Sequence, residues 1–377
     1  MAYVFKKPDG TLIVRPITHP ATDEQVNAQL RALSESGQLQ IETKRNLKIT
    51  AHRGYHVDVP QNTLASFVAA VDNGFEWLEI DVHKTQDGVY VLGHNSTVTL
   101  YNNGVATSVT WYTSNYSDIK DYTWDAEGEY PLGTLSQALN LLKVYNAKVI
   151  IDRKSGSTAD IVKEISQSGM ADDCFISFDS VASAVGAIDL LNQFNTLGAR
   201  VITTENDDLK LLATSTSNPI LADVNANTLG SNASVRKALS IALSVGVPIM
   251  FSGCTLSNKK VWNVIASGVM ANDDGNIPYS TFLDEFKHDM DVSDITCATD
   301  NINLALSDDT TITATTDIDA PMCYIFAYPF DASIVDVEQL SFGNSISVKI
   351  TGIKVGNTKV RLFTGSGTHK DIDVIVS

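Results

Sequence analysis

The chain has 377 residues, of which 44% are hydrophobic and 19% are charged, a composition typical of globular proteins and unlike that of disordered or low-complexity chains. At roughly 100–200 residues per domain, this length indicates two domains, or one large domain with additions. The 27 basic and 44 acidic residues give a formal net charge of −17, which disfavours binding to nucleic acid or to anionic membrane surfaces. The sequence has no basic patch and no run of 18 apolar residues, so we expect no nucleic-acid partner and no membrane span.

Residues 1–46 predict a small N-terminal element. A Pro-Asp-Gly turn separates VFKK from TLIVRP, which is typical of a β-hairpin. A helix is expected next, because Thr22 and Gln25 have capping-box spacing and Gly37 supplies a stop. Its narrow apolar stripe favours packing against another chain, as an attachment or homo-oligomerisation element, or packing on its own domain. The first residues lack the apolar core of a secretory signal, so we expect no export signal.

Residues 47–285 alternate short β-branched runs with amphipathic helical segments. The strand-like runs are LKITAH, EWLEIDV, VYVLGH, KVIID, CFISF, ARVIT, PILAD and VPIMF. The helix-like runs are TLASFVAAVDN, TLSQALNLLKVY, SVASAVGAIDLLNQF, SVRKALSIALSVG and KKVWNVIASG. This alternation predicts an α/β fold with a parallel sheet, and about 240 residues fit a TIM-type (β/α)8 barrel. The strand count stays open by one, because GVMAND is another candidate for the last strand and PILAD would then be a connection.

Residues 293–377 change pattern to short strand-like runs separated by turns, which predicts an all-β Ig-like sandwich. The runs are INLAL, TTITATT, CYIFAY, SIVDVE, SISVKIT, TKVRLF and DIDVIV. The region has no Trp, so the Cys…Trp…Cys signature of a true immunoglobulin domain is missing. The chain's 4 cysteines form no CxxC pair and are most simply buried thiols, although Cys297 and Cys323 are candidates for a disulfide under oxidising conditions.

The candidate chemistry lies between the first and fourth strands of the predicted barrel. His52 ends the first strand, and the C-terminal ends of the strands form the mouth of such barrels. Glu79 and Asp81 are two positions apart on a strand, so both side chains project from one face. Adjacent carboxylates repel each other unless a cation neutralises them, and oxygen ligands suit Mg²⁺ or Ca²⁺. We expect His94 after the third strand, and Asp152 with its neighbours after the fourth, to reach the same rim.

Several motifs of this region together resemble the glycerophosphodiester phosphodiesterase family. They are HRG at 52–54, PQNTLASF at 60–67, Gly74 before EWLEIDV, TQDGVYVLGHN at 85–95, YPLGTLSQAL at 130–139 and IIDRK at 150–154. The resemblance covers about 100 residues strongly and the rest of the barrel faintly. It implies a TIM-type barrel that hydrolyses glycerophosphodiesters to glycerol phosphate and an alcohol with one divalent cation, Mg²⁺ or Ca²⁺.

The resemblance also implies residue roles. Three carboxylates match the family's metal ligands: Glu79, Asp81 and Asp152. Two histidines match its acid/base pair, His52 and His94, and two cations match residues near the phosphate, Arg53 and Lys154. This set is chemically consistent, because a phosphodiester needs its oxygens neutralised, a base for the attacking oxygen and an acid for the leaving alkoxide.

The chain departs from the family pattern at several positions. PENT is replaced by PQNT with Gln61, HD by His94-Asn95, the glutamate of ExK by Asp152, and a WTVN-like strand by residues 249–252. Gln61 and Asn95 each remove a negative charge near the mouth, and Asp152 is about 1.3 Å shorter in reach than Glu. These changes affect the expected metal affinity and substrate choice more than the reaction class.

Other residues of this region have structural interpretations. We expect His56 to be structural and His83 to point away from Asp81 toward the helices. Asn62 is expected to cap or orient the first helix, because Asn favours N-cap positions. Residues 95–130 are an aromatic-rich insertion, which predicts either a long loop whose Trp111 and Trp124 stack on the leaving alcohol or a satellite core.

Two function classes follow from these observations. The first is a metal-dependent hydrolase acting on a small glycerophosphodiester or on a glycerol-phosphate polymer of the teichoic-acid type. The second is a catalytically weak surface or phage-tail protein that binds such polymers. A phospholipase D-like lipid enzyme is a third interpretation, but it needs an apolar docking surface that the sequence lacks. We expect a virion, tail or cytoplasmic protein, with action at a cell surface indicated by the Ig-like module.

Overall fold

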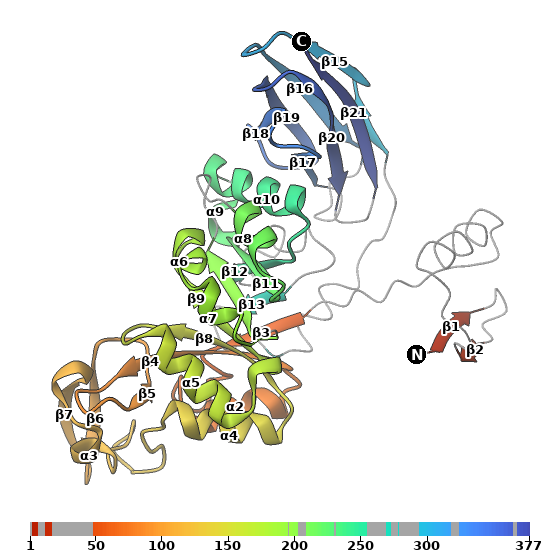
Figure 1. Cartoon of the computed structure of the whole chain (residues 1–377). Helices are drawn as coiled ribbons and strands as arrows, with labels where there is room; N and C mark the ends of the chain where they lie inside the picture. The colour runs from red at the N-terminus through yellow and green to blue at the C-terminus, as the bar shows by residue number, and fades with distance from the viewer. Residues whose placement is uncertain are drawn as a thin grey trace. The chain divides into compact units, whose positions relative to one another are not determined.

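The computed structural model describes residues 2–6, 12–16, 48–194, 196–202, 209–229, 231–254, 269–272, 278, 294–317, 324–364 and 368–377. The chain divides into two compact units, Met1–Asn46 and Leu47–Ser377. In the first unit β1 (Ala2–Lys6) pairs antiparallel with β2 (Leu12–Pro16), which confirms the predicted hairpin (Figure 1). The helices predicted after Thr22 and for KKVWNVIASG lie outside the described residues.

The second unit contains a closed parallel barrel. One nine-stranded sheet has the order β3-β13-β12-β11-β10-β9-β8-β4-β5, and an additional β3–β4 pairing closes it. Every neighbouring pair in this described sheet is parallel except β4–β5. The strands are β3 (Lys48–His52), β4 (Trp77–Lys84), β5 (Tyr90–Leu92), β8 (Lys148–Arg153), β9 (Cys174–Phe178), β10 (Gly198–Ile202), β11 (Ile220–Asn225), β12 (Ile249–Cys254) and β13 (Val269–Asn272). The predicted (β/α)8 architecture is therefore confirmed.

One strand assignment within the barrel was wrong. The run VYVLGH forms β5, which pairs antiparallel with the last three residues of β4 and is not a barrel strand of its own. The turn between them is tight, with the Thr85 amide donating to the Val89 carbonyl at 2.9 Å. Such a short connection can only form a hairpin, because parallel strands need a crossover of about a dozen residues or more. The strand count, which the sequence left open by one, is settled because both candidates are strands: PILAD contributes to β11 and GVMAND contributes to β13.

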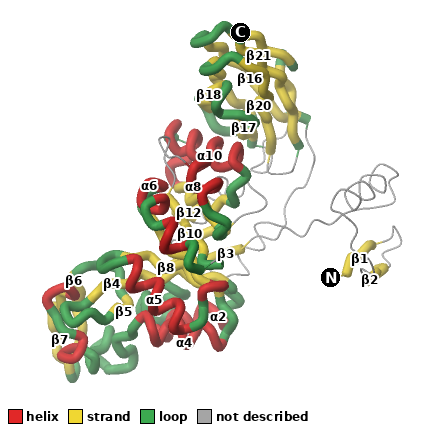
Figure 2. Tube along the Cα trace, in the orientation of Figure 1, coloured by secondary structure: helices red, strands yellow, loops and turns green. Residues whose placement is uncertain are grey.

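Helices follow most of the barrel strands (Figure 2). They are α2 (Leu64–Asp72), α4 (Leu135–Val144), α5 (Thr158–Ser168), α6 (Val181–Val185), α7 (Ile188–Leu191), α8 (Leu209–Ser215), α9 (Ala226–Leu229) and α10 (Ala233–Val245). Thr63 and Thr134 begin α2 and α4 with capping boxes, which satisfy the first backbone N–H groups. The run SVASAVGAIDLLNQF divides into α6 and α7 rather than one helix.

The described helices include none that combines the length and apolar character needed to cross a membrane.

Apolar residues fill the lower part of the barrel. One buried cluster within it contains Trp77, Ile150, Phe175, Leu221 and Met250. Trp77 lies on the same face of β4 as Glu79 and Asp81, because side chains alternate along a strand. A layer of buried apolar side chains therefore lies beneath the polar residues of the site.

The insertion between β5 and α4 has regular structure, against the expectation of a long loop. It contains β6 (Thr97–Asn102), β7 (Val105–Thr110), a 3₁₀ turn η1 (Trp111–Thr113) and α3 (Tyr116–Ile119). β6 and β7 form an antiparallel hairpin. Its apolar residues form a separate buried cluster of Val91, Leu100, Val109, Trp111, Ile119 and Leu132. The alternative of a satellite core is confirmed.

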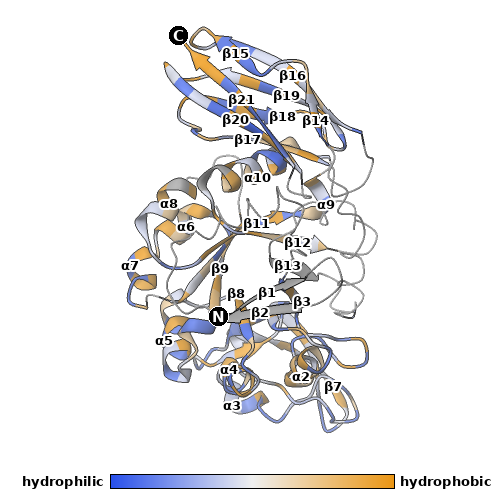
Figure 3. Cartoon of the chain, turned by 90° about the vertical axis from the view of Figure 1, so that its right-hand side faces the viewer, coloured by the Kyte–Doolittle hydropathy of each residue, from blue (hydrophilic) through white to orange (hydrophobic). Residues whose placement is uncertain are grey.

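The C-terminal region consists of two four-stranded sheets, β14-β16-β19-β18 and β15-β21-β20-β17, consistent with a sandwich. The strands are β14 (Ile295–Cys297), β15 (Asn301–Leu304), β16 (Asp309–Thr316), β17 (Ile325–Pro329), β18 (Val335–Gln339), β19 (Ser345–Gly352), β20 (Gly356–Thr364) and β21 (His369–Val376). Hydrophobic and hydrophilic residues alternate along them (Figure 3), and the inward set forms one core. Cys297 is a free thiol, whereas Cys323 lies outside the described residues.

The turn after β3 requires a glycine, and this requirement gives a stability prediction. Gly54 has a φ of +78°, and a Cβ there would lie 2.7 Å from backbone atoms of Ser66. We expect Gly54→Ala to destabilise the fold by about 3 kcal/mol or more, because left-handed strain and overpacking add. Gly128→Ala is the matched control, since Gly128 has a φ of +83° with nothing within 4 Å of its Cβ position. Urea unfolding checks this, and equal losses in the two variants would contradict it.

Candidate active site

Three carboxylates meet at the mouth of the barrel, as the sequence predicted. Glu79 and Asp81 project from β4, and Asp152 projects from β8 directly beside Asp81 in the parallel register. One ligand oxygen from each lies within 4.8 Å of the others. Glu79 and Asp81 are only 3% and 1% exposed, whereas Asp152 is partly exposed. Three oxygen donors converging in this way suit one hard divalent cation.

Two cations of the chain lie against this cluster. Lys154 Nζ is 3.1 Å from Asp81 Oδ1 and 3.0 Å from Asp152 Oδ2. Arg53 Nε is 3.0 Å from Asp81 Oδ2. Each oxygen of Asp81 therefore has a cation beside it. The chain's own charges compensate much of the carboxylate repulsion, and a metal ion at Asp81 would compete with Lys154 or Arg53.

Asn62 holds Asp81 from a second direction. Its Nδ2 donates to Asp81 Oδ2 at 2.9 Å, and the Asp81 backbone N–H donates to Asn62 Oδ1 at 3.0 Å. Asn62 is 1% exposed and has a φ of 54°, a conformation that Asn tolerates better than most residues. The prediction that Asn62 caps the first helix was wrong, because Thr63 is the N-cap of α2. Asn62 instead orients a carboxylate of the site.

The pKa values of the two buried carboxylates, Glu79 and Asp81, shift in opposite directions. Burial raises the pKa of Glu79 well above its usual value, and the neighbouring Asp81 and Asp152 raise it further. Burial also raises the pKa of Asp81, but Lys154, Asn62 and Arg53 outweigh it and the net shift is downward. Of these two carboxylates, Glu79 is therefore the one that an additional positive charge would stabilise more. This electrostatic deficit and the all-oxygen donor set both fit a bound divalent cation.

Of the two predicted acid/base histidines, His52 is the last residue of β3 and His94 lies in the bend that follows β5. His52 ends β3 opposite Glu79 in the parallel register, and its Nε2 is 3.8 Å from Glu79 Oε2. His94 follows Gly93, whose backbone N–H donates to the Asp81 carbonyl at 3.0 Å. His94 Nδ1 lies 3.0 Å from Asn95 Oδ1, so Asn95 keeps an acceptor for the ring despite lacking a charge. His52 therefore lies next to the carboxylate cluster, and the backbone that carries His94 is bonded to the backbone of Asp81.

Gln61 similarly preserves a contact while removing a charge. Arg53 Nη1 donates to Gln61 Oε1 at 2.9 Å. The Arg53 backbone N–H reaches the Glu79 carbonyl oxygen at 3.0 Å. The guanidinium is thus held at the rim between a neutral amide and Asp81.

His83 was misplaced by the sequence interpretation. Residues 81 and 83 lie on the same face of β4, since side chains alternate with period two. The structure accordingly buries His83 at the rim, with Nε2 2.9 Å from the His94 carbonyl oxygen and Nδ1 3.3 Å from Ser155 Oγ. Burial lowers the pKa of His83. The residue belongs to the surroundings of His94 and not to the helical layer.

Arg200 and Asp223 are site neighbours that the sequence interpretation missed. Arg200, on β10, donates from Nη2 to the Asp223 carboxylate and from Nη1 to Ser177 Oγ at 2.7 Å. Its Nη1 also lies 3.8 Å from Asp152 Oδ2. An Arg within the apolar run ARVIT was a usable signal, because a buried charge needs a partner.

The aromatic insertion does not offer Trp111 to a substrate. Trp111 is fully buried, and its ring centroid is 6.4 Å from that of Trp124, which packs against the same cluster. Trp111 Nε1 donates to the Asn95 carbonyl at 2.7 Å. The hypothesis that Trp111 stacks on the leaving alcohol was therefore wrong.

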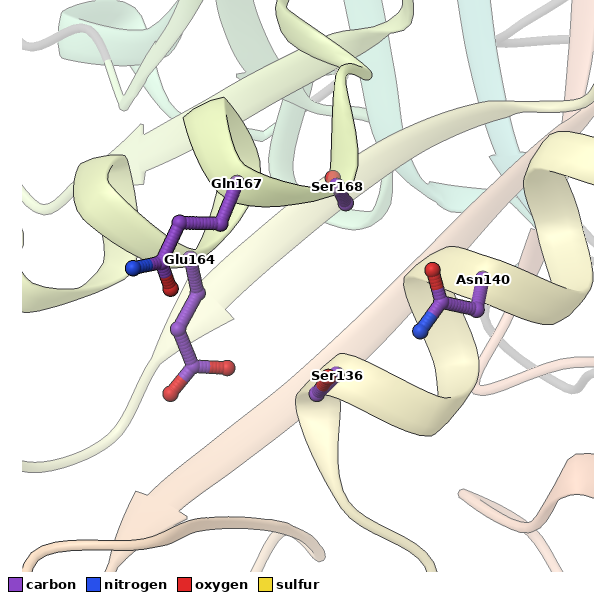
Figure 4. Close-up of a pocket in the computed structure, with 5 residues that line it drawn as sticks. All are labelled: Ser136, Asn140, Glu164, Gln167 and Ser168. Carbon is purple, nitrogen blue, oxygen red and sulfur yellow. The ribbon is translucent and has the colours of Figure 1, made fainter.

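A polar groove outside the barrel contains none of these residues (Figure 4). It has a volume of about 300 Å³ and lies between α4 and α5, lined by Ser136, Asn140, Glu164, Gln167 and Ser168. It contributes nothing to the carboxylate cluster.

Comparison with known proteins decides the family. The model of the glycerophosphoryl diester phosphodiesterase family matches residues 52–268, which is more than half of the 377 residues. This chain belongs to that family. The match begins at His52 and includes every carboxylate, histidine and cation of the site described above.

Individual relatives match shorter segments. A glycerophosphodiester phosphodiesterase of Caldanaerobacter subterraneus subsp. tengcongensis is 43% identical over 56 residues, which are 15% of this chain and 23% of that protein. Glycerophosphodiester phosphodiesterase 1 of Rattus norvegicus is 50% identical over 48 residues, 14% of its length. The chain thus matches less than a quarter of these relatives. A glycerophosphodiester phosphodiesterase structure from Parabacteroides distasonis has a TM-score of 0.50 at 18% identity, covering 64% of this chain and 97% of that one, which supports the fold.

The buried Glu79 gives a pH prediction for the metal-free protein. Its pKa is raised in the folded state, so the contribution of Glu79 to wild-type stability falls as the pH rises above the unfolded-state pKa of about 4.3. Glu79→Gln removes the buried charge, and we expect its stability relative to wild type to increase from pH 5 to pH 8. Urea unfolding in EDTA at both pH values measures this. Glu127→Gln changes an exposed carboxylate and is the control. A pH-independent difference for Glu79→Gln would refute the prediction.

Proposed function

We propose that the chain hydrolyses glycerophosphodiesters, releasing glycerol phosphate and an alcohol. One observation carries the proposal. Three carboxylates lie together with His52, Arg53 and Lys154 in a barrel whose sequence matches the family model, and the segment that carries His94 is bonded to the backbone of Asp81. These groups supply the parts that phosphodiester hydrolysis needs, which are charge neutralisation, a base and an acid.

Glu79, Asp81 and Asp152 would hold one divalent cation, Mg²⁺ or Ca²⁺. When bound, it would neutralise phosphate charge as a Lewis acid. Arg53 and Lys154 are placed to share this task, because both lie at about 3 Å from Asp81 and can turn a donor toward a phosphate oxygen. The net charge of −17 makes such local positive charge necessary for an anionic substrate.

His52 and His94 divide the proton transfers between them. One imidazole accepts the proton of the attacking hydroxyl, and the other donates a proton to the leaving alkoxide. If the substrate's own glycerol hydroxyl attacks first, a cyclic phosphate forms and water then opens it, with the two histidines exchanging roles. Imidazole suits this exchange, because its unperturbed pKa is about 6.5 and both protonation states are accessible near neutral pH.

The substrate is proposed to be a glycerol-phosphate polymer of the teichoic-acid type rather than a small metabolite. A barrel for residues 47–285 would then act beside an Ig-like module at 293–377, with residues 1–46 serving attachment or oligomerisation, as in a cell-surface or phage-tail protein. This part rests on architecture alone.

A second candidate is a catalytically weak protein that binds such polymers. The observation favouring it is that Arg53 and Lys154 already pair with Asp81, which lowers the need for a metal. In that case the cluster would be structural.

One assay separates these candidates. Glycerophosphocholine and poly(glycerol phosphate) are each incubated with the protein, with and without EDTA, and glycerol phosphate release is measured. We expect EDTA-sensitive release, and losses of about 10²-fold or more in kcat for His52→Ala and for His94→Ala. His369→Ala, an exposed histidine of β21, is the control. Absence of EDTA-sensitive release from both substrates would overturn the enzymatic proposal, and release from the polymer alone would support the cell-envelope role.

A further inference from the structure

We infer that His83 and Trp111 are positioning residues that hold the backbone of His94 and Asn95, and so fix the His94 imidazole at the rim. The inference rests on the proposed function of His94 and extends it to two side chains that do not touch the reacting atoms. It also assigns a role to the aromatic insertion, which is to hold the backbone next to His94.

The His83 contact has a defined direction. A carbonyl oxygen only accepts hydrogen bonds, so Nε2 of His83 donates to the His94 carbonyl at 2.9 Å. Ser155 Oγ accepts the Lys84 backbone N–H at 2.9 Å and lies 3.3 Å from His83 Nδ1. In the neutral ring with its hydrogen on Nε2, Nδ1 is an acceptor, so the Ser155 hydroxyl donates to it. This chain of hydrogen bonds links the segment after β8 to the residue after β5.

Trp111 holds the next carbonyl along the chain. Its Nε1 donates to the Asn95 carbonyl at 2.7 Å. The Trp111 and His83 rings are stacked, with centroids 6.4 Å apart and an interplanar angle of 30°. The successive carbonyls of His94 and Asn95 thus accept hydrogen bonds from two stacked rings, one on β4 and one on η1.

Because both donors are buried, the loss of either hydrogen bond would be costly. Trp111 is 0% exposed and His83 is 6% exposed, so water does not readily replace a lost donor. The indole also closes the space before His94, since a Cβ at Gly93 would lie 3.1 Å from Trp111 Cζ2. The indole therefore contacts the residues before and after His94 in the chain.

The satellite core explains how the indole is held. Trp111 packs with Leu100 of β6, Val109 of β7 and Ile119 of α3. These residues come from three elements of the insertion, so its hairpin and helix fix the ring from several sides.

The test removes each donor while keeping an aromatic ring. In Trp111→Phe and His83→Phe we expect kcat to fall by about tenfold, the effect of losing one buried hydrogen bond, with KM within about twofold. His83→Gln keeps a donor and should recover most of kcat. Trp124→Phe is the matched control, because its buried Nε1 has no hydrogen-bond partner among the described residues; we expect its kcat to change by less than twofold. Thermal unfolding verifies folding, and the two His83 variants carry the test if Trp111→Phe does not fold.

A second readout is independent of activity. Hydrogen exchange of a peptide spanning residues 92–97 should accelerate in Trp111→Phe and His83→Phe but not in Trp124→Phe. If exchange in this peptide is unchanged in the first two variants, or kcat falls equally in Trp111→Phe and Trp124→Phe, the inference is overturned. If the wild type shows no EDTA-sensitive activity, the proposed function fails, whereas hydrogen exchange still decides whether these rings hold the segment.

Discussion

The site depends on the burial of Asp81, a carboxylate that is 1% exposed at the mouth of the barrel. A buried charge is stable only if it is paired and hydrogen-bonded. Lys154 and Arg53 supply the opposite charge, and Asn62 supplies a hydrogen bond to the carboxylate. These partners come from the segments that follow β3 and β8. The charge and hydrogen-bond requirements of Asp81 therefore bring separate sequence motifs together at the mouth of the barrel.

The same requirement connects the electrostatics to a metal. Asp81 is compensated by its neighbours, whereas burial and two adjacent carboxylates leave Glu79 with a raised pKa. A cation shared by Glu79, Asp81 and Asp152 would remove this imbalance. The substitution of Asp152 for a glutamate fits this arrangement, since its shorter side chain lies between Lys154 and Arg200.

The outer part of the site is organised by backbone contacts. β5 returns antiparallel to β4, so the residue before His94 bonds to the backbone of Asp81 and does not lead into a new barrel strand. The aromatic insertion then packs on this return, and its buried indole bonds to the Asn95 carbonyl. An insertion whose aromatic composition suggested a substrate wall thus contacts the backbone next to His94.

The sequence by itself determined the α/β barrel, the C-terminal β-strands and the separate motifs of the site, because these depend on local periodicity, turn residues and motif spacing. It also contained the information to place His83 on the face of Asp81, through simple alternation. Only the tertiary structure decided that VYVLGH is a hairpin partner, that Arg200 reaches Asp152, and that Asn62 bonds to Asp81. These contacts join residues far apart in the chain, and burial selects their partners only after the barrel has closed.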